Sequence, residues 1–463
     1  MLGNPDSSLR WRGPVRNLFI AATALGAAAL GPNFAAAEMK VFQEGGLTLN
    51  LGIEAGTYYV RGESVNFGTG QVDLRNGNVR SDTVDSFEAF VKPSISASYD
   101  NSAVGTIYGG AAFVGTLTRG DGDPGGFTVG EEEDVDLERL FVGWRSGNLL
   151  KSSGKDAIDV SFGRQEFQIG DGFLIKDGNL DQFDKAAFWL APRNAFEQAA
   201  LVRINTKPVR GDAFYLMSDG DQDDTRLAGG NVEYVHETYG TLGGSYFHII
   251  DADDVNYTRK GMNVVSVRGQ GKPVAAVPDL SLAGEFVHES GGADGADIDA
   301  HAWYLEAGYT FSKLPWSPKI AYRFSRFTGD DPSTSDIETF DPLFYGYSRG
   351  WGTWYQGEIA GEYLLFNSNQ QTHMVHLSAT PTDSFGVGAI YYKFLLDENS
   401  YFGTPVASRD FADELNVYVD WYGLDYLSLG ALYAVTFPAS GATEAFGGDE
   451  PFQVFQLYAN IKF

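Results

Sequence analysis

The last nine residues of the chain alternate between apolar and polar side chains and end on an aromatic residue. Successive side chains of a β-strand point to opposite faces, so this alternation predicts a strand with two unlike faces. The apolar face carries Phe455, Leu457, Ala459, Ile461 and Phe463, and the polar face carries Gln456, Tyr458, Asn460 and Lys462. A terminal strand of this kind has one face suited to lipid and one suited to water.

The other end of the chain predicts export. Arg10, Arg12 and Arg16 precede an apolar run that ends at Leu30, and three alanines, 35–37, offer a cleavage site of small residues. This pattern is typical of a secretory signal peptide. The apolar run of about 13 residues is too short for a membrane anchor, which needs ~20. We therefore expect residues 1–37 to be removed and 38–463 to form the mature protein.

The composition explains why hydropathy alone does not reveal a membrane protein. The mean hydropathy is −0.19 and 20% of the residues are charged. In a transmembrane β-barrel only every second strand residue meets lipid, so such a composition is expected. The chain has no cysteine, which excludes disulfide bonds, and its net charge of −28 argues against nucleic acid as a partner.

Short alternating segments recur from residue 47 to the end, separated by linkers that are alternately short and long. This order is typical of a bacterial outer-membrane β-barrel with tight periplasmic turns and long extracellular loops. The fold class predicted is all-β, a transmembrane antiparallel barrel of about 18 strands. Segment 330–369 is long enough to hide another hairpin, which would make 20 strands. The long linkers are 62–84, 119–134, 169–194, 252–261, 290–300, 329–369, 396–410 and 438–451.

The long loops carry most of the excess acid, as in 121–123, 131–134, 219–224, 251–254 and 294–299. Two interpretations fit these loops. Their carboxylates could bind divalent cations that bridge lipopolysaccharide, because carboxylates are hard oxygen ligands. Alternatively, they keep long polar loops solvated, and no run has the spacing of a dedicated calcium loop.

The strands carry basic residues on the face opposite to the apolar one. Arginine on the lipid face costs about 2–4 kcal/mol at the midplane, so we expect these side chains to face the lumen. They could pair with acids such as Glu197, Glu306 and Asp420 to fill the barrel. Alternatively, they could present free guanidinium groups to a carboxylate or phosphate. The expected lumen residues are Arg139, Arg145, Arg203, Arg268, Lys319 and Arg323.

Several motifs resemble the alginate export family. They are Phe162-Gly163-Arg164-Gln165 followed by 170–172, the aromatic stretch 340–347 followed by Trp354 and 357–358, and the segments 391–394 and 413–415. The resemblance covers about 159–463. It implies an 18-stranded monomeric barrel whose arginine-rich lumen passes an anionic uronate polysaccharide outward.

The same resemblance implies that Arg164 contacts solute in the lumen. Simple alternation from Ile158 instead puts Arg164 on the apolar face. Either a β-bulge intervenes, or Arg164 lies at the rim above the lipid. The acidic loops are a second departure, since they would repel a polyanion at the outer mouth. Either this repulsion matters little for export, or the solute is not alginate, because a fold does not fix the solute that it carries.

Segment 330–369 is too long for a simple connection and is rich in aromatic residues, which stack on sugar rings. One interpretation is an aromatic constriction in the pore, and the other is an extracellular loop that packs on the barrel rim. The candidate constriction residues are Tyr345, Tyr347, Trp351, Trp354 and Tyr355.

The sequence offers little for catalysis or for a metal. His373 and His376 lie three apart on an expected strand and so face opposite sides. His288 and Ser290 lie near a strand end, but their proximity in sequence does not make a catalytic triad. We expect no catalytic residue, no metal site and no cofactor.

The function predicted is an outer-membrane pore for an anionic or polar carbohydrate, such as an alginate-like polysaccharide. The alternative is a general or selective porin for uptake of small solutes, and a weaker one is an outer-membrane hydrolase. Expected partners are outer-membrane lipid, lipopolysaccharide, the carbohydrate or solute, and the barrel-assembly machinery. The direction of transport and the choice between monomer and trimer are left open by the sequence.

Overall fold

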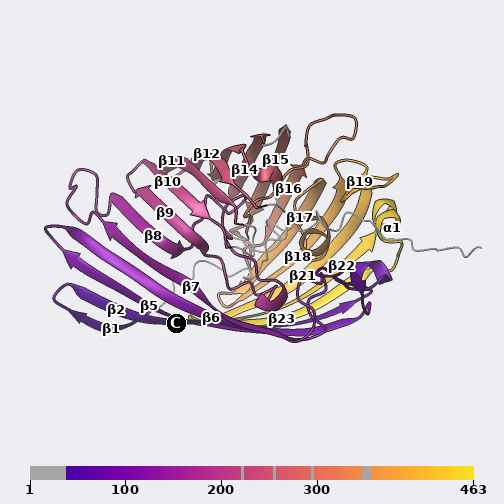
Figure 1. The fold of residues 1–463 in the computed structure, drawn as a ribbon, viewed down its shortest axis with the longest axis horizontal. Coiled ribbons are helices and arrows are strands. Elements are labelled where there is room, and N and C mark those ends of the chain that lie inside the picture. Colours follow the sequence, from indigo (N-terminus) through magenta and orange to yellow (C-terminus); the bar gives the residue numbers. More distant parts are fainter. Residues whose placement is uncertain (1–37, 220–223, 254–256, 293–296, 347–355) are drawn as a thin grey trace, which may run out of the picture.

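The computed structural model describes residues 38–219, 224–253, 257–292, 297–346 and 356–463. The expected signal peptide, 1–37, lies outside the described residues. One closed antiparallel barrel dominates the fold (Figure 1). Among the described residues, no helix is long and apolar enough to cross a membrane.

The main sheet has 19 strands, of which β1 (Met39–Glu44) pairs only with β2, so 18 close the barrel wall. The described part of segment 330–369 adds no strand to this wall, which settles the strand number at 18. The wall strands are β2 (Leu47–Glu63), β5 (Val84–Asn101), β6 (Gly105–Gly120), β7 (Glu132–Arg145), β8 (Ile158–Gln165), β9 (Phe196–Ile204), β10 (Val209–Met217), β11 (Arg226–His236), β12 (Gly240–Asp251), β13 (Met262–Gly271), β14 (Leu280–Gly291), β15 (Ile298–Thr310), β16 (Lys319–Phe327), β17 (Gln370–Thr382), β18 (Phe385–Leu396), β21 (Asp410–Leu424), β22 (Leu427–Pro438) and β23 (Phe452–Lys462).

Small elements lie in the connections. In Figure 1, α1 (Ser440–Phe446) and β19 (Ser400–Tyr401) lie at the end with the long loops, and β1 lies at the opposite end. The others are η2 (Val65–Gly68), β3 (Val72–Asp73), β4 (Asn78–Val79), η3 (Phe183–Lys185), η5 (Tyr257–Arg259), η6 (Ala360–Leu365) and β20 (Thr404–Pro405).

The terminal strand closes the barrel in the register that its alternation predicts. β23 pairs with β2, and the backbones of Ile53 and Phe463 exchange hydrogen bonds of 3.0 and 2.9 Å. Leu457 and Phe463 are exposed on the outer face, whereas Gln456 is fully buried inside. The ammonium group of Lys462 lies 2.7 Å from the carboxylate of Glu54 on the lumen face. Closure leaves no free edge in the wall.

Two long connections fold into the barrel. One joins β8 to β9 (residues 166–195), and the other joins β16 to β17, described at 328–346 and 356–369. Both contribute to each of two apolar cores inside the barrel. One core contains Trp189 and Leu364, and the other contains Ile175 and Phe344. The lumen is therefore narrowed by packed protein at the end that carries the long loops.

Candidate functional site: the lumen and its inward loops

The wall holds the 166–195 loop through polar side chains of β5, β6 and β7. Lys92 of β5 donates a 2.9 Å hydrogen bond to the carbonyl of Pro192, and Thr118 of β6 accepts one of 2.9 Å from the N–H of Ala187. Glu88 of β5 accepts hydrogen bonds from the N–H groups of residues 189 and 190. Loop backbone has no ladder partner, so these side chains satisfy groups that would otherwise be buried without one.

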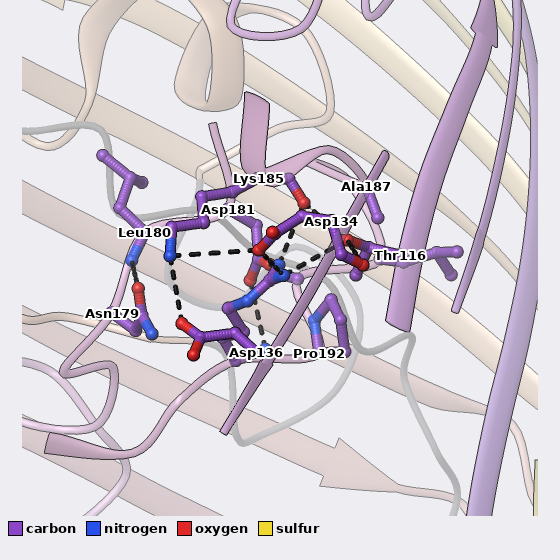
Figure 2. A network of polar contacts seen from close by, with 12 residues as sticks. Thr116, Asp134, Asp136, Asn179, Leu180, Asp181, Lys185, Ala187 and Pro192 are labelled. Atoms are coloured by element: carbon purple, nitrogen blue, oxygen red, sulfur yellow. Dashed lines mark hydrogen bonds and ion pairs between the residues drawn. The ribbon is translucent and has the colours of Figure 1, made fainter. Parts of the chain in front are cut away.

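Arg193 is the centre of this attachment and is fully buried. Its guanidinium lies 2.5 Å from Asp181 in the same loop and 2.7 Å from Asp134 on β7. Figure 2 shows how Asp134 and Asp136 face Lys185, whose ammonium group is 3.0 Å from Asp136. Burial raises the pKa of Asp181 to about 6, although the charge of Arg193 opposes this shift. This network was not predicted from the sequence.

The second inward loop is held by charged residues as well. Arg259 of η5 makes a two-pronged contact with Asp341, at 2.5 and 2.8 Å. Glu289 of β14 accepts a 3.0 Å hydrogen bond from the N–H of Asp341. Further along, Glu414 of β21 accepts hydrogen bonds from the N–H groups of residues 359 and 360, at the start of η6. Wall carboxylates therefore hold both inward loops.

Stacked aromatic rings pack the first inward loop against the wall and against the connection between β6 and β7. Trp189 lies parallel to Tyr58 of β2, with ring centroids 4.0 Å apart, and Phe188 lies 4.1 Å from Phe127. Of the five candidate constriction residues, Tyr345 is 1% exposed and lies inside the barrel. The other four, Tyr347, Trp351, Trp354 and Tyr355, lie outside the described residues. The aromatic contacts at Phe188 and Trp189 were missed, although an apolar run inside a long polar linker could have indicated them.

Four of the predicted lumen residues pair with carboxylates. Arg145 lies 3.4 Å from Asp159, and its guanidinium lies over the ring of Tyr108. The other pairs are Arg164 with Asp219 at 2.5 Å, Arg268 with Glu233 at 2.7 Å, and Arg323 with Glu306 at 3.7 Å. Arg323 is 1% exposed and also donates to Gln356 of the second inward loop. These side chains hold the wall and the loops together.

The other three are partly exposed on the lumen face: Arg139 on β7, Arg203 on β9 and Lys319 on β16. None of them forms an ion pair with a residue that the structure describes. Arg203 aligns with aspartates of both neighbouring strands, and its guanidinium lies 5.8 Å from the ring of Phe167. No carboxylate of the described residues therefore lies within ion-pair distance of these three cations.

A β-bulge explains why Arg164 does not lie on the apolar face, where simple alternation would place it. The pairing of β8 with β9 passes from Gly163 to Gln165, so Arg164 has no partner residue on β9. Gly163 has a φ of +126°, a conformation that side chains rarely allow. The bulge turns the guanidinium toward Asp219, a buried residue in the connection after β10.

Several acidic residues of the long loops form hydrogen bonds or ion pairs within the protein, in the ranges that the structure describes. Asp123 is fully buried and accepts hydrogen bonds from the backbone and the hydroxyl of Thr128. Burial raises the pKa of Asp123 to about 6. Glu132 lies 2.8 Å from Arg75, and Asp134 pairs with Arg193. Residues 220–223, 254–256 and 293–296 lie outside the described residues.

The histidines do not converge. His376 faces the lumen and hydrogen-bonds Tyr418, whereas His373 faces outward and hydrogen-bonds Tyr322, as their spacing predicts. His288 lies 3.7 Å from Asp299. Within the described ranges, no group of three potential ligands is placed to hold a metal ion.

A family model described as alginate export matches residues 80–404. This chain belongs to the alginate export family. The match includes the bulged strand β8, both inward loops and the wall from β5 to β18. No curated protein sequence matches the chain.

Solved outer-membrane porins share the fold. Pseudomonas aeruginosa OccD3 (OpdP) aligns with a TM-score of 0.53 at 12% identity, covering 96% of this chain and 99% of the porin. P. aeruginosa OpdL aligns with a TM-score of 0.55 at 10% identity, over 90% and 98% of the two chains. P. aeruginosa OpdK, solved with vanillate, aligns with 0.54 at 11% identity, over the same shares. Family membership together with the closed barrel identifies the chain as an outer-membrane β-barrel pore, and its apolar outer face suits contact with lipid.

Proposed function

We propose that this pore passes carboxylated carbohydrate, with alginate-like uronate chains or their oligomers as the expected class. The observation that carries the proposal is the set of three partly exposed lumen cations, Arg139, Arg203 and Lys319, without an ion pair among the described residues. A guanidinium presents a planar pair of donors that matches a carboxylate. Membership of the alginate export family supports a uronate as the source of that carboxylate.

The remaining predicted lumen residues have a different role in this proposal. Arg145, Arg164, Arg268 and Arg323 are neutralised by acids of the wall or the connections. Their positive charge is therefore compensated before a solute arrives. We expect selectivity for anions to depend on the three unpaired cations, with no catalytic step in the pore.

The test is block of the ion current through the purified pore in planar bilayers. Oligouronates added to one side should interrupt the current, and neutral oligosaccharides of equal length should interrupt it less. Equal block by both would show that carboxylates are not recognised, and a cation-selective pore without block would contradict the proposal.

A selective pore for small solutes is the second candidate. It is favoured by the two packed cores in the lumen, which a bulky polymer would have to displace. The structural neighbour OpdK was solved with vanillate, a small carboxylate. Swelling of vesicles that contain the pore separates the candidates, because this one predicts rapid entry of monomeric uronates and exclusion of longer chains.

A further inference from the structure

Three glutamates on the lumen face of the wall meet the inward loops in the same way. Glu88 on β5, Glu138 on β7 and Glu414 on β21 are fully buried. Each accepts hydrogen bonds from two consecutive backbone N–H groups of a loop. A buried carboxylate needs such donors, and the loop N–H groups need an acceptor, so each partner stabilises the burial of the other.

We propose that Glu88, Glu138 and Glu414 are positioning residues that dock the two inward loops and so set the open area of the pore. Glu88 and Glu138 dock residues 189–190 and 194–195 of the first loop, and Glu414 docks residues 359–360 of the second. The inference rests on the pore function but not on the identity of the solute. These glutamates form a set separate from Arg139, Arg203 and Lys319, and they control the width of the passage.

The three glutamates differ in how they use their oxygens. Glu88 receives the N–H of Trp189 on Oε1 at 3.3 Å and that of Leu190 on Oε2 at 3.0 Å. Glu414 also divides its two donors, with Ile359 on Oε1 at 3.3 Å and Ala360 on Oε2 at 2.7 Å. Both sites therefore require two acceptor oxygens.

Glu138 receives both N–H groups, of Asn194 and Ala195, on Oε1 alone, at 2.9 and 3.2 Å. Glutamine has one acceptor oxygen and one amide nitrogen. Glu88→Gln and Glu414→Gln would therefore turn an amide N–H toward a backbone N–H. Glu138→Gln keeps both hydrogen bonds and serves as the matched control.

The first readout is single-channel conductance of the full-length mature chain in KCl without carbohydrate. One buried hydrogen bond left unmade should lower the ratio of docked to released loop about 5- to 150-fold. Glu88→Gln and Glu414→Gln should then show larger and noisier conductance, and Glu138→Gln should match the parent protein. If Glu88→Gln does not assemble, Glu88→Asp keeps the charge but withdraws both oxygens, and it should have the same effect.

The second readout assigns each glutamate to its loop. The chain has no cysteine, so a single Ala187→Cys or Ala360→Cys replacement gives a clean labelling site, and both alanines are fully buried. Glu88→Gln should expose position 187 to a water-soluble maleimide without exposing 360, and Glu414→Gln should do the reverse. Migration of unboiled protein on a gel confirms that each barrel is closed. Closed barrels with parental conductance and no labelling in both glutamine variants would overturn the proposal, as would equal effects of Glu138→Gln and Glu88→Gln.

Discussion

The guanidinium of Arg268 on β13 reaches across β12 to Glu233 on β11, with Nη2 of Arg268 2.7 Å from Oε1 of Glu233. The intervening strand has Gly243 at this position, and a Cβ there would lie 2.8 Å from Cζ of Arg268. Absence of a side chain on β12 therefore allows a salt bridge between strands that are not neighbours. Both side chains are less than a tenth exposed.

Removing one partner of this pair should destabilise the folded barrel. Glu233→Ala leaves the guanidinium of Arg268 buried without its carboxylate, which should reduce the free energy of unfolding by about 3–5 kcal/mol. Urea unfolding of the barrel in lipid vesicles measures this change. The control is Lys207→Ala, which breaks a pair with Glu237 that is about four-fifths exposed and should cost at most about 1 kcal/mol. Equal costs for both variants would contradict the structural role of Arg268.

Trp189 should control both loop stability and pore width. Its ring stacks on Tyr58 and also lies 5.6 Å from Tyr458, so Trp189→Ala removes a large buried contact between the loop and the wall. We expect a loss of about 3–5 kcal/mol for the docked loop and a larger conductance from a barrel that still closes. The same substitution at Trp316, which is 62% exposed, should change neither quantity.

The second inward loop should loosen as the pH rises. Burial, and then the carboxylate of Glu414, raise the pKa of Glu358 from 4.5 to about 8. The docked segment then holds this proton more tightly than a released one. Its stability is therefore greatest at about pH 4.5 and below, declines as the pH rises toward 8, and declines no further above that value.

Open-channel noise recorded between pH 4.5 and 8.5 measures this effect, and it should increase with pH. Glu358→Gln removes the titrating group and should flatten the profile. If open-channel noise depends on pH in Glu358→Gln as it does in the parent pore, Glu358 is not the group that causes the pH response.

The sequence predicted the outer face of the barrel well, because lipid contact imposes a strict period of two on every strand. The same rule explains why His373 faces outward and His376 faces the lumen. It also explains the register of Phe463 against Ile53. The sequence narrowed the strand number only to 18 or 20, because the apolar and aromatic residues of segment 330–369 suit a membrane strand as well as an inward loop.

The lumen was harder to predict, because its contacts join residues that are far apart in sequence. Phe247 is fully buried by inward-folded protein, whereas its neighbour Tyr246 is about half exposed. Alternation alone places Phe247 on the lumen face, where contact with water would be expected. Glu88 and Arg193 were missed for the same reason, as their partners lie about a hundred residues away or in a loop whose path the sequence does not indicate.

The reversal potential of the pore in a KCl gradient, recorded before and after neutralisation of Arg139, Arg203 and Lys319, tests directly whether these cations select the solute. We expect an anion-selective parent pore and a clear loss of anion selectivity and of oligouronate block in Arg139→Gln/Arg203→Gln/Lys319→Gln. The matched triple variant of paired residues, Arg145→Gln/Arg164→Gln/Arg268→Gln, should change selectivity less in barrels that close. A parent pore that prefers cations, or a first triple variant with parental selectivity and block, would show that these three cations do not select the solute.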